Sequence, residues 1–112
     1  MERLAGIDFA RSYLLNVIYD DRSLTLEMDW RLDHGHPKYS ESGEDGDCFR
    51  QGFIRFGDIV DLRLDKARAP DGGPVTDYSK INSVRFDGDH FAISCGWGEI
   101  EVTARAVRVA VD

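Results

Sequence analysis

The sequence predicts a mainly β protein with one domain, residues 1–112, built as an antiparallel β-sandwich or flattened barrel of about seven strands. Three observations lead to this prediction. Apolar and polar residues alternate with period two along most of the chain. Short polar or glycine-containing turns separate the alternating segments. The length of 112 residues suits one domain, and no stretch shows the apolar spacing of a long helix.

The first two predicted strands form a hairpin. Residues 24–32 alternate apolar and polar side chains, which is typical of a half-buried strand. Residues 13–19 are apolar at nearly every position, so we expect a more central strand there, buried on both faces. The four polar residues 20–23 between them predict a short turn. Before the hairpin, residues 2–12 have room for one helical turn.

A second hairpin is predicted over residues 49–64. Residues 49–56 are rich in aromatic side chains on both faces, and residues 60–64 alternate apolar and charged side chains. Gly57 and Asp58 stand between the two segments and predict the turn. Loops are expected before and after this hairpin, at 34–47 and 67–80, and loops of this length are commonly functional or mobile.

The last third of the chain predicts a meander. Residues 81–86, 91–97 and 100–111 read as strands, separated by glycine-containing turns at 87–89 and 96–98. After Ala106 the apolar residues change phase, which predicts a β-bulge or a strand that passes between two sheets. Aromatic side chains are expected to build the core of so small a domain, because each buries a large apolar area. These are Tyr13, Tyr19, Trp30, Phe53, Phe56, Phe86, Phe91 and Trp97.

The charge composition limits the classes of partner. The chain has 21 acidic and 14 basic residues, and its net charge of −7 argues against nucleic acid binding. No apolar run is long enough for a membrane-spanning helix, and the first residues do not resemble a secretory signal. We therefore expect a cytoplasmic protein whose two cysteines, Cys48 and Cys95, are reduced, with Cys95 as a buried structural thiol.

An acidic stretch lies at residues 33–47, with five acidic residues and one lysine. Its composition resembles a calcium loop, but the spacing of an EF-hand is absent. A local negative field attracts basic partners, so we predict that this stretch contacts a protein partner with a basic surface. The predicted contacts are Glu41, Glu44, Asp45 and Asp47.

His34 and His36 are the candidate metal ligands. Two histidines at positions i and i+2 of an extended segment point to one side and can chelate a divalent ion. No third ligand follows at a recognised spacing, so a solvated loop with two surface histidines is the simpler explanation of the pair. The sequence contains no nucleophile–base constellation and no phosphate-binding glycine loop, so we predict no catalytic residues, no cofactor and no enzyme activity.

The pattern of the chain resembles small bacterial β-rich proteins of unknown function, including immunity proteins of polymorphic toxin systems. The resemblance rests on residues 8–10 leading into 13–19, on residues 23–33 and 53–62, and on the closing meander. Such proteins often carry a His-Asp-Ala-like segment before the first strand, and here Ile7 stands in place of the histidine. The resemblance implies binding to a protein partner, and an acidic surface suits a basic toxin domain.

Three functions remain open at the level of sequence. The first is a non-enzymatic cytoplasmic module that binds a protein, with a toxin-neutralising immunity protein as its specific form. The second is a β-barrel that binds a small molecule or a metal through His34 and His36. The third is a structural module that self-associates through an edge strand, for which residues 107–111 are the candidate homodimer edge.

Overall fold

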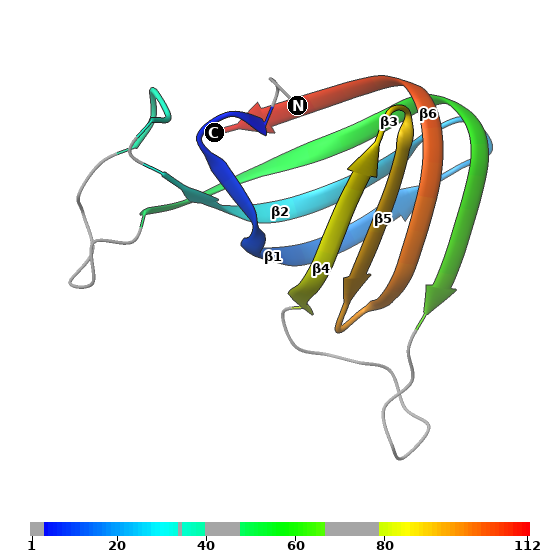
Figure 1. Ribbon diagram of the computed structural model, residues 1–112, viewed down its shortest axis with the longest axis horizontal. Helices are drawn as coiled ribbons and strands as arrows, with labels where there is room; N and C mark the ends of the chain where they lie inside the picture. The colour runs from blue at the N-terminus through cyan, green and yellow to red at the C-terminus, as the bar shows by residue number, and fades with distance from the viewer. Residues whose placement is uncertain (1–3, 34, 40–47, 67–78) are drawn as a thin grey trace, which may run out of the picture.

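Six antiparallel strands make up most of the residues that the structure describes, which are 4–33, 35–39, 48–66 and 79–112. This computed structural model arranges the strands as one sheet that closes on itself in the order β1–β2–β3–β6–β5–β4 (Figure 1). The predicted mainly β, antiparallel fold class is confirmed, and of the two predicted architectures the chain adopts the barrel. The strands are β1 (Ile7–Tyr19), β2 (Leu24–Leu32), β3 (Cys48–Lys66), β4 (Ser79–Asp87), β5 (His90–Cys95) and β6 (Gly98–Val111).

The β1–β2 hairpin forms where it is predicted. Every second side chain of β2, from Leu24 to Leu32, is at most 2% exposed, which matches the alternation of the sequence. In the turn, Oδ1 of Asp20 accepts hydrogen bonds from the backbone amides of Arg22 and Ser23, both at 2.8 Å. These bonds favour the charged carboxylate and so lower the pKa of Asp20 below its ordinary value.

β1 differs from its prediction in two respects. It begins at Ile7, so residues 7–12 are strand, and among the described residues the turn predicted within 2–12 is limited to Leu4, which has 3₁₀ geometry. It is also not buried on both faces, because Ile18 is 51% exposed and Leu15 is half-buried. A closed barrel of one sheet has no second layer over its outer surface, which leaves outward apolar side chains in contact with water.

A bulge near the start of β1 changes the direction of the strand. The register of β1 against β2 shifts between Asp8 and Tyr13. Ser12 lies in this bulge, is 1% exposed, and donates a hydrogen bond from Oγ to the carbonyl oxygen of Asp8 at 2.7 Å. The same hydroxyl accepts a hydrogen bond from the backbone amide of Arg31 at 2.9 Å. The hydroxyl therefore satisfies backbone groups that the bulge removes from the ladder.

The predicted hairpin at Gly57 and Asp58 is wrong, because β3 continues through both residues as one strand of 19 residues. Asp58 has a φ of 48°, in the left-handed region that aspartate tolerates better than most side chains. This change of direction bends β3 into a corner and does not reverse it (Figure 1). Residues 49–56 and 60–64 are thus two arms of one strand, which is why the described chain has six strands.

β6 bends at the same corner. Ala104 and Val107 both pack against the core although they are three positions apart, and they lie opposite Ile59 and Phe56 of β3. The predicted change of phase is therefore present as a bend that two paired strands share. The associated register shift lies on the β3 side, between Ile59 and Asp61. Of the two predicted causes, the structure shows a bulge within one continuous sheet.

The two closing hairpins are confirmed. Asp87 of β4 pairs with His90 of β5 across a two-residue turn, in which Gly88 has a φ of 61° that favours glycine. Cys95 of β5 pairs with Gly98 of β6 across the next turn. β5 is the shortest strand and lies between β4 and the first arm of β6, residues 98–103 (Figure 1).

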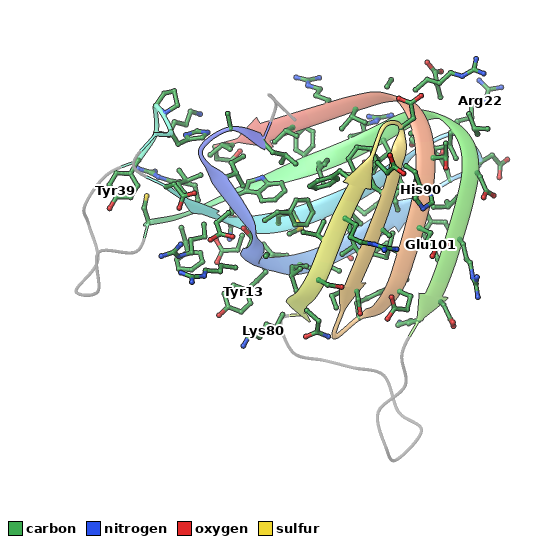
Figure 2. The ribbon with its side chains drawn as sticks, in the orientation of Figure 1. Tyr13, Arg22, Tyr39, Lys80, His90 and Glu101 are labelled. Carbon is green, nitrogen blue, oxygen red and sulfur yellow. The ribbon has the colours of Figure 1, made fainter. Side chains whose placement is uncertain are left out.

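The barrel closes through a short junction between β1 and β4. Two residue pairs join these strands in the described chain, Tyr13 with Lys80 and Leu14 with Ser79, and Figure 2 labels the first pair. The rest of β4 has no backbone pairing with β1 among the described residues. Closure along that stretch therefore depends on side chains.

Aromatic side chains fill the interior beside this junction. The ring of Phe9 lies 5.0 Å from the ring of Trp30 and 5.8 Å from that of Phe86, measured between centroids. Phe91 lies 4.9 Å from Phe86 and 4.8 Å from Phe56, so the rings form a continuous chain of edge-to-face contacts. Trp30, Phe56 and Phe91 are at most 1% exposed.

The aromatic core prediction is correct for these three residues and wrong for others. Tyr19 is 60% exposed at the end of β1. Phe86 and Trp97 fit the prediction in part: Phe86 is 38% exposed although its ring contacts Phe9 and Phe91, and Trp97 is half-buried against the core. Tyr13 and Phe53 lie on the outer face of the barrel, on the side opposite to their buried strand neighbours. No helix in the described residues is long and apolar enough to cross a membrane.

Candidate functional site

The predicted metal pair is described only in part. His36 lies in the turn at 35–39, where its Nδ1 accepts a hydrogen bond from the backbone amide of Lys38 at 3.0 Å. The backbone of His36 also lies against Gly6, where an added Cβ would be 2.8 Å from the Cα of His36. His34 lies outside the described residues. Among the residues that are described, no group of three or more histidine, cysteine, aspartate or glutamate side chains could hold a metal ion.

The predicted partner contacts also fall outside the described residues. Glu41, Glu44, Asp45 and Asp47 belong to the segment 40–47, and the prediction for them stays a prediction. Both cysteines, in contrast, are described, buried and free. Burial raises the pKa of the Cys95 thiol above its ordinary value, which disfavours the reactive thiolate and agrees with a structural role.

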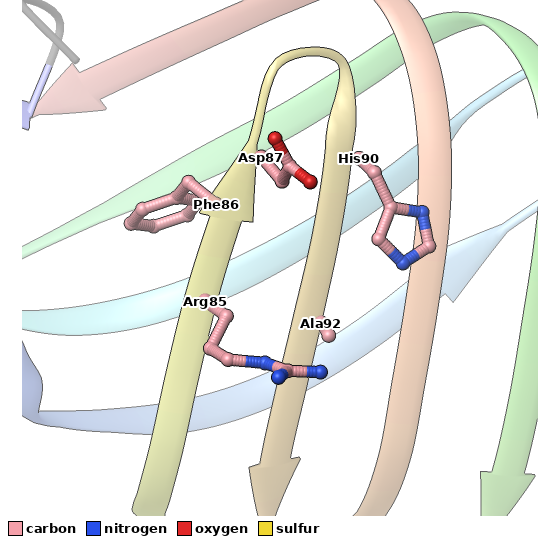
Figure 3. Close-up of a pocket in the computed structure, with 5 residues that line it drawn as sticks. All are labelled: Arg85, Phe86, Asp87, His90 and Ala92. Atoms are coloured by element: carbon pink, nitrogen blue, oxygen red, sulfur yellow. The ribbon is translucent and has the colours of Figure 1, made fainter.

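One hollow lies on the outer face of the β4–β5 hairpin (Figure 3). It has a volume of 440 Å³ and is lined by Arg85, Phe86, Asp87, His90 and Ala92. Arg85 reaches from β4 toward Ala92, its direct partner on β5, whose methyl group leaves the space open. The sequence did not single out this cluster, because its members lie on two strands and meet only through pairing.

The imidazole of His90 in this hollow is positioned by a hydrogen bond to a neighbouring strand. Nδ1 of His90 lies 2.9 Å from Oγ1 of Thr103 on β6, its neighbour across the ladder. Asp87 faces His90 from β4, so an imidazole, a carboxylate and the Arg85 guanidinium share one small surface. Such a set can bind a small polar group. Arg85 and Asp87 are both exposed to water.

A second surface lies on the outer side of β1, β2 and β3. Large apolar or aromatic side chains gather on it although it faces water. Ile18 is 51% exposed and Phe49 is 39% exposed, and the rings of Tyr13 and Phe49 lie 6.0 Å apart. A sheet face that looks to solvent ordinarily carries polar side chains, so this concentration points to a contact surface. We call it the β1–β3 outer face, and its apolar members are Tyr13, Leu15, Ile18, Phe49 and Phe53.

The β1–β3 outer face contains a hollow of 330 Å³. Leu15, Ile18 and Phe53 supply its apolar lining, and Leu15 reaches it because the β1–β2 register shifts between Leu14 and Asn16. The charged residues of the lining are Glu27 and Asp112, and both are acidic. The remaining lining residues are Thr25, Gln51 and Gly52.

Asp29 adds a third carboxylate to this face. It lies on β2 between Tyr13 of β1 and Gln51 of β3, and its side chain is half-buried. Burial raises the pKa of the Asp29 carboxyl above its ordinary value, because it disfavours the charged form. The described residues offer this carboxylate no hydrogen bond and no ion pair. A cation bound over this face would be attracted by the negative charge of the Asp29 carboxylate.

The sequence contains a signal for this face that its interpretation missed. Residues 13–19 and 49–56 are apolar on both sides, which predicts burial on both sides only where a second layer exists. In a barrel the same pattern means an apolar outer surface. Residues 107–111, the predicted homodimer edge, pair with β3 on one side and have no pairing on the other side among the described residues.

A comparison of this chain with protein-family models, curated proteins and solved structures finds no match.

Proposed function

We propose that this protein is a non-enzymatic binding module that docks a protein partner on the β1–β3 outer face. The observation that carries the proposal is the hollow of 330 Å³ on that face, whose lining among the described residues combines apolar side chains with acidic residues and has no basic one. The partner is a protein that presents a lysine or arginine side chain surrounded by apolar side chains. This is the chemistry that complements the hollow.

The charges around the hollow favour a basic partner. Glu27 and Asp112 line it, and Asp29 lies beside them on β2. Arg31 is the neighbouring base on β2, and it already forms ion pairs with Asp8 at 3.3 Å and with Asp33 at 3.7 Å. The net charge of −7 adds long-range attraction for a basic protein. The resemblance to immunity proteins offers a candidate partner, a basic toxin domain.

The filled interior directs binding to the outer surface. Trp30, Phe56 and Phe91 occupy the centre of the described barrel, together with the aliphatic side chains of the neighbouring strands. A small ligand would therefore have to bind in a surface hollow such as the one at His90. The proposal places the protein in the cytoplasm, in agreement with its two free, buried thiols.

The test compares baits that differ by one charge reversal. The unaltered protein, Glu27→Lys and Glu101→Lys are immobilised and exposed to lysate of the source organism, and retained proteins are quantified by mass spectrometry. Glu101 is the matched control, because it is also an exposed strand glutamate but lies on β6, near the His90 hollow (Figure 2). We expect the unaltered and Glu101→Lys baits to retain at least one protein in equal amounts. The amount of that protein retained by the Glu27→Lys bait should be about tenfold lower.

A second step tests the partner directly. The retained protein is purified, and its affinity is measured against the unaltered chain, Glu27→Lys and Phe53→Ser, with thermal melting as a check of folding. Both substitutions should weaken binding, and salt should weaken it further, because charges carry part of the attraction. Equal retention by all three baits would contradict the proposal. So would a self-association that Phe53→Ser abolishes, because the face would then bind a second copy.

A further inference from the structure

β3 and β6 bend together at one corner of the barrel (Figure 1). A basic hollow lies on the residues of this corner. Its volume is 270 Å³, and its lining is Arg55 and Gly57 from β3 with Ala106, Val107 and Arg108 from β6. The charged groups of this lining are both arginines, whereas the chain as a whole carries a charge of −7. The hollow is therefore a local exception to the electrostatics of the protein.

The two arginines face each other directly. Arg55 and Arg108 are partners in the β3–β6 ladder, so their Cβ atoms are close neighbours on the same outer face. Like charges in this arrangement repel and destabilise a sheet unless something compensates them. Among the residues that the structure describes, neither guanidinium has a carboxylate within ion-pair distance.

The neighbouring groups do not supply that compensation. The guanidinium carbon of Arg108 lies 5.9 Å from the centre of the Phe53 ring, a cation–π contact that positions the side chain without neutralising it. The charge of Arg55 helps to lower the pKa of Asp20, but no ion pair joins the two side chains. Oδ1 of Asp20 already accepts hydrogen bonds from the backbone amides of Arg22 and Ser23 in the β1–β2 turn. Farther along the corner, Arg105 adds a third base between Ala104 and Ala106, whose ladder partners Ile59 and Gly57 flank Asp58.

The floor of the hollow is open because two small residues meet there. Gly57 and Ala106 are ladder partners beside the arginine pair. A Cβ at Gly57 would lie 3.7 Å from the Cβ of Ala106, an ordinary contact, so packing does not demand a glycine at this position. The missing side chain leaves room for a group that lies between the two guanidinium ions.

We propose that this hollow binds a doubly charged oxyanion of the phosphate class, held between Arg55 and Arg108. Each guanidinium can donate two parallel hydrogen bonds to such a group, and two of them balance its charge. The shared chemistry is a terminal phosphate, whether free inorganic phosphate or a phosphate monoester. The basic hollow shares no lining residue with the acidic hollow, although Arg108 contacts Phe53 at the edge of the β1–β3 outer face. The variants that test phosphate binding therefore differ from those that test the protein partner, and either proposal can fail alone.

The test is a titration at constant ionic strength, because the surplus negative charge of the chain makes anion binding sensitive to salt. Inorganic phosphate, phosphoserine and acetate are added at pH 7.5 to ¹⁵N-labelled protein, with chloride as the balancing ion, and amide shifts are followed by NMR. We expect both phosphates, or one of them, to bind at least tenfold more tightly than acetate. The shifts should centre on residues 55–57 and 106–108.

Four variants locate the site. Arg55→Gln and Arg108→Gln should each weaken phosphate binding at least tenfold, and Ala106→Phe should do the same by filling the hollow while both charges remain. Arg63→Gln is the matched control, because Arg63 is an exposed arginine on the other arm of β3, opposite Glu101. Its affinity should equal that of the unaltered protein.

The result also separates the two phosphate sources. Binding of inorganic phosphate alone identifies a free phosphate ion, and tighter binding of phosphoserine identifies a monoester. The proposal is overturned if acetate binds as tightly as both phosphates, or if Arg63→Gln weakens binding as much as Arg55→Gln. It is also overturned if folded Ala106→Phe protein, verified by its amide spectrum, keeps full affinity.

Discussion

Gly52 of β3 lies where the backbone of β6 and the ring of Trp30 leave no room for a side chain. A Cβ at this position would be 2.0 Å from the carbonyl oxygen of Ala110 and 2.8 Å from Cδ1 of Trp30. The same carbonyl oxygen accepts a hydrogen bond from Nε1 of Trp30 at 3.0 Å. A side chain at this position would block the hydrogen bond between the indole and that carbonyl oxygen, which joins β2 to β6 across β3. The glycine therefore allows Trp30, the largest side chain of the core, to satisfy its N–H group.

We predict that Gly52→Ala lowers the free energy of unfolding by about 1–3 kcal/mol, the usual cost of overpacking a core. Urea denaturation followed by tryptophan fluorescence measures the change, and the fluorescence of Trp30 should shift as its environment loosens. Gly35→Ala is the control, because no atom lies within 4 Å of a Cβ built there. An equal loss of stability in both variants would show that the contact with Trp30 is unimportant.

Asp29 shows what sequence cannot tell about a single residue. Its position on the polar side of β2 predicts an ordinary solvated carboxylate, and the alternation of the strand is correct. Its ladder partners are Tyr13 and Gln51, which belong to other strands. The raised pKa and the functional interest of Asp29 therefore come from neighbours that only pairing brings together.

The sequence correctly predicts strand on both sides of the β3 corner, but it wrongly predicts two strands where the structure has one. Gly57 and Asp58 are turn-forming residues, and their presence between two alternating segments favours a hairpin. A left-handed residue changes the direction of the chain in either case. Whether the chain reverses or continues depends on its partner, and β6 follows β3 on both sides of the bend.

We predict that Asp58→Val lowers the free energy of unfolding by about 1–2 kcal/mol, because a β-branched side chain is strained at positive φ. Asp58→Gly should keep stability within about 0.5 kcal/mol of the unaltered protein, because glycine adopts this conformation readily. Thermal and urea denaturation give both values. Asp61→Val is the control on the same strand, and a comparable loss there would mean that the φ of Asp58 is not the cause.

At the scale of the whole molecule, closure of the barrel is its weakest part in terms of backbone pairing. β1 and β4 share two residue pairs in the described chain, whereas β3 and β6 pair from Gly52 with Val111 to Lys66 with Gly98. Phe9 supplies the packing that the ladder lacks, since its ring contacts Trp30 on β2 and Phe86 on β4. The side chain is 4% exposed.

We predict that Phe9→Ala lowers the free energy of unfolding by about 3–5 kcal/mol, the range for deleting a buried aromatic ring. Amide hydrogen exchange of residues 81–87 should accelerate more than that of β2, because the junction opens first. Phe49→Ala is the control: this ring is 39% exposed on the β1–β3 outer face and should cost far less. Uniform acceleration across all strands would contradict a local opening of the junction.

The sequence by itself determined the antiparallel β class, the β1–β2 turn, the two closing hairpins and the buried face of β2. These features depend on local alternation and on turn residues, which act over a few positions along the chain. Tertiary structure alone decided that β3 is one bent strand, that the sheet closes into a barrel, and that apolar side chains of β1 and β3 face outward. The physical reason is that the local sequence does not show whether a second layer covers the outer face of a strand, so it does not show whether apolar side chains on that face are buried. A pair such as Arg55 and Arg108 likewise depends on the register between two strands that are far apart in the sequence.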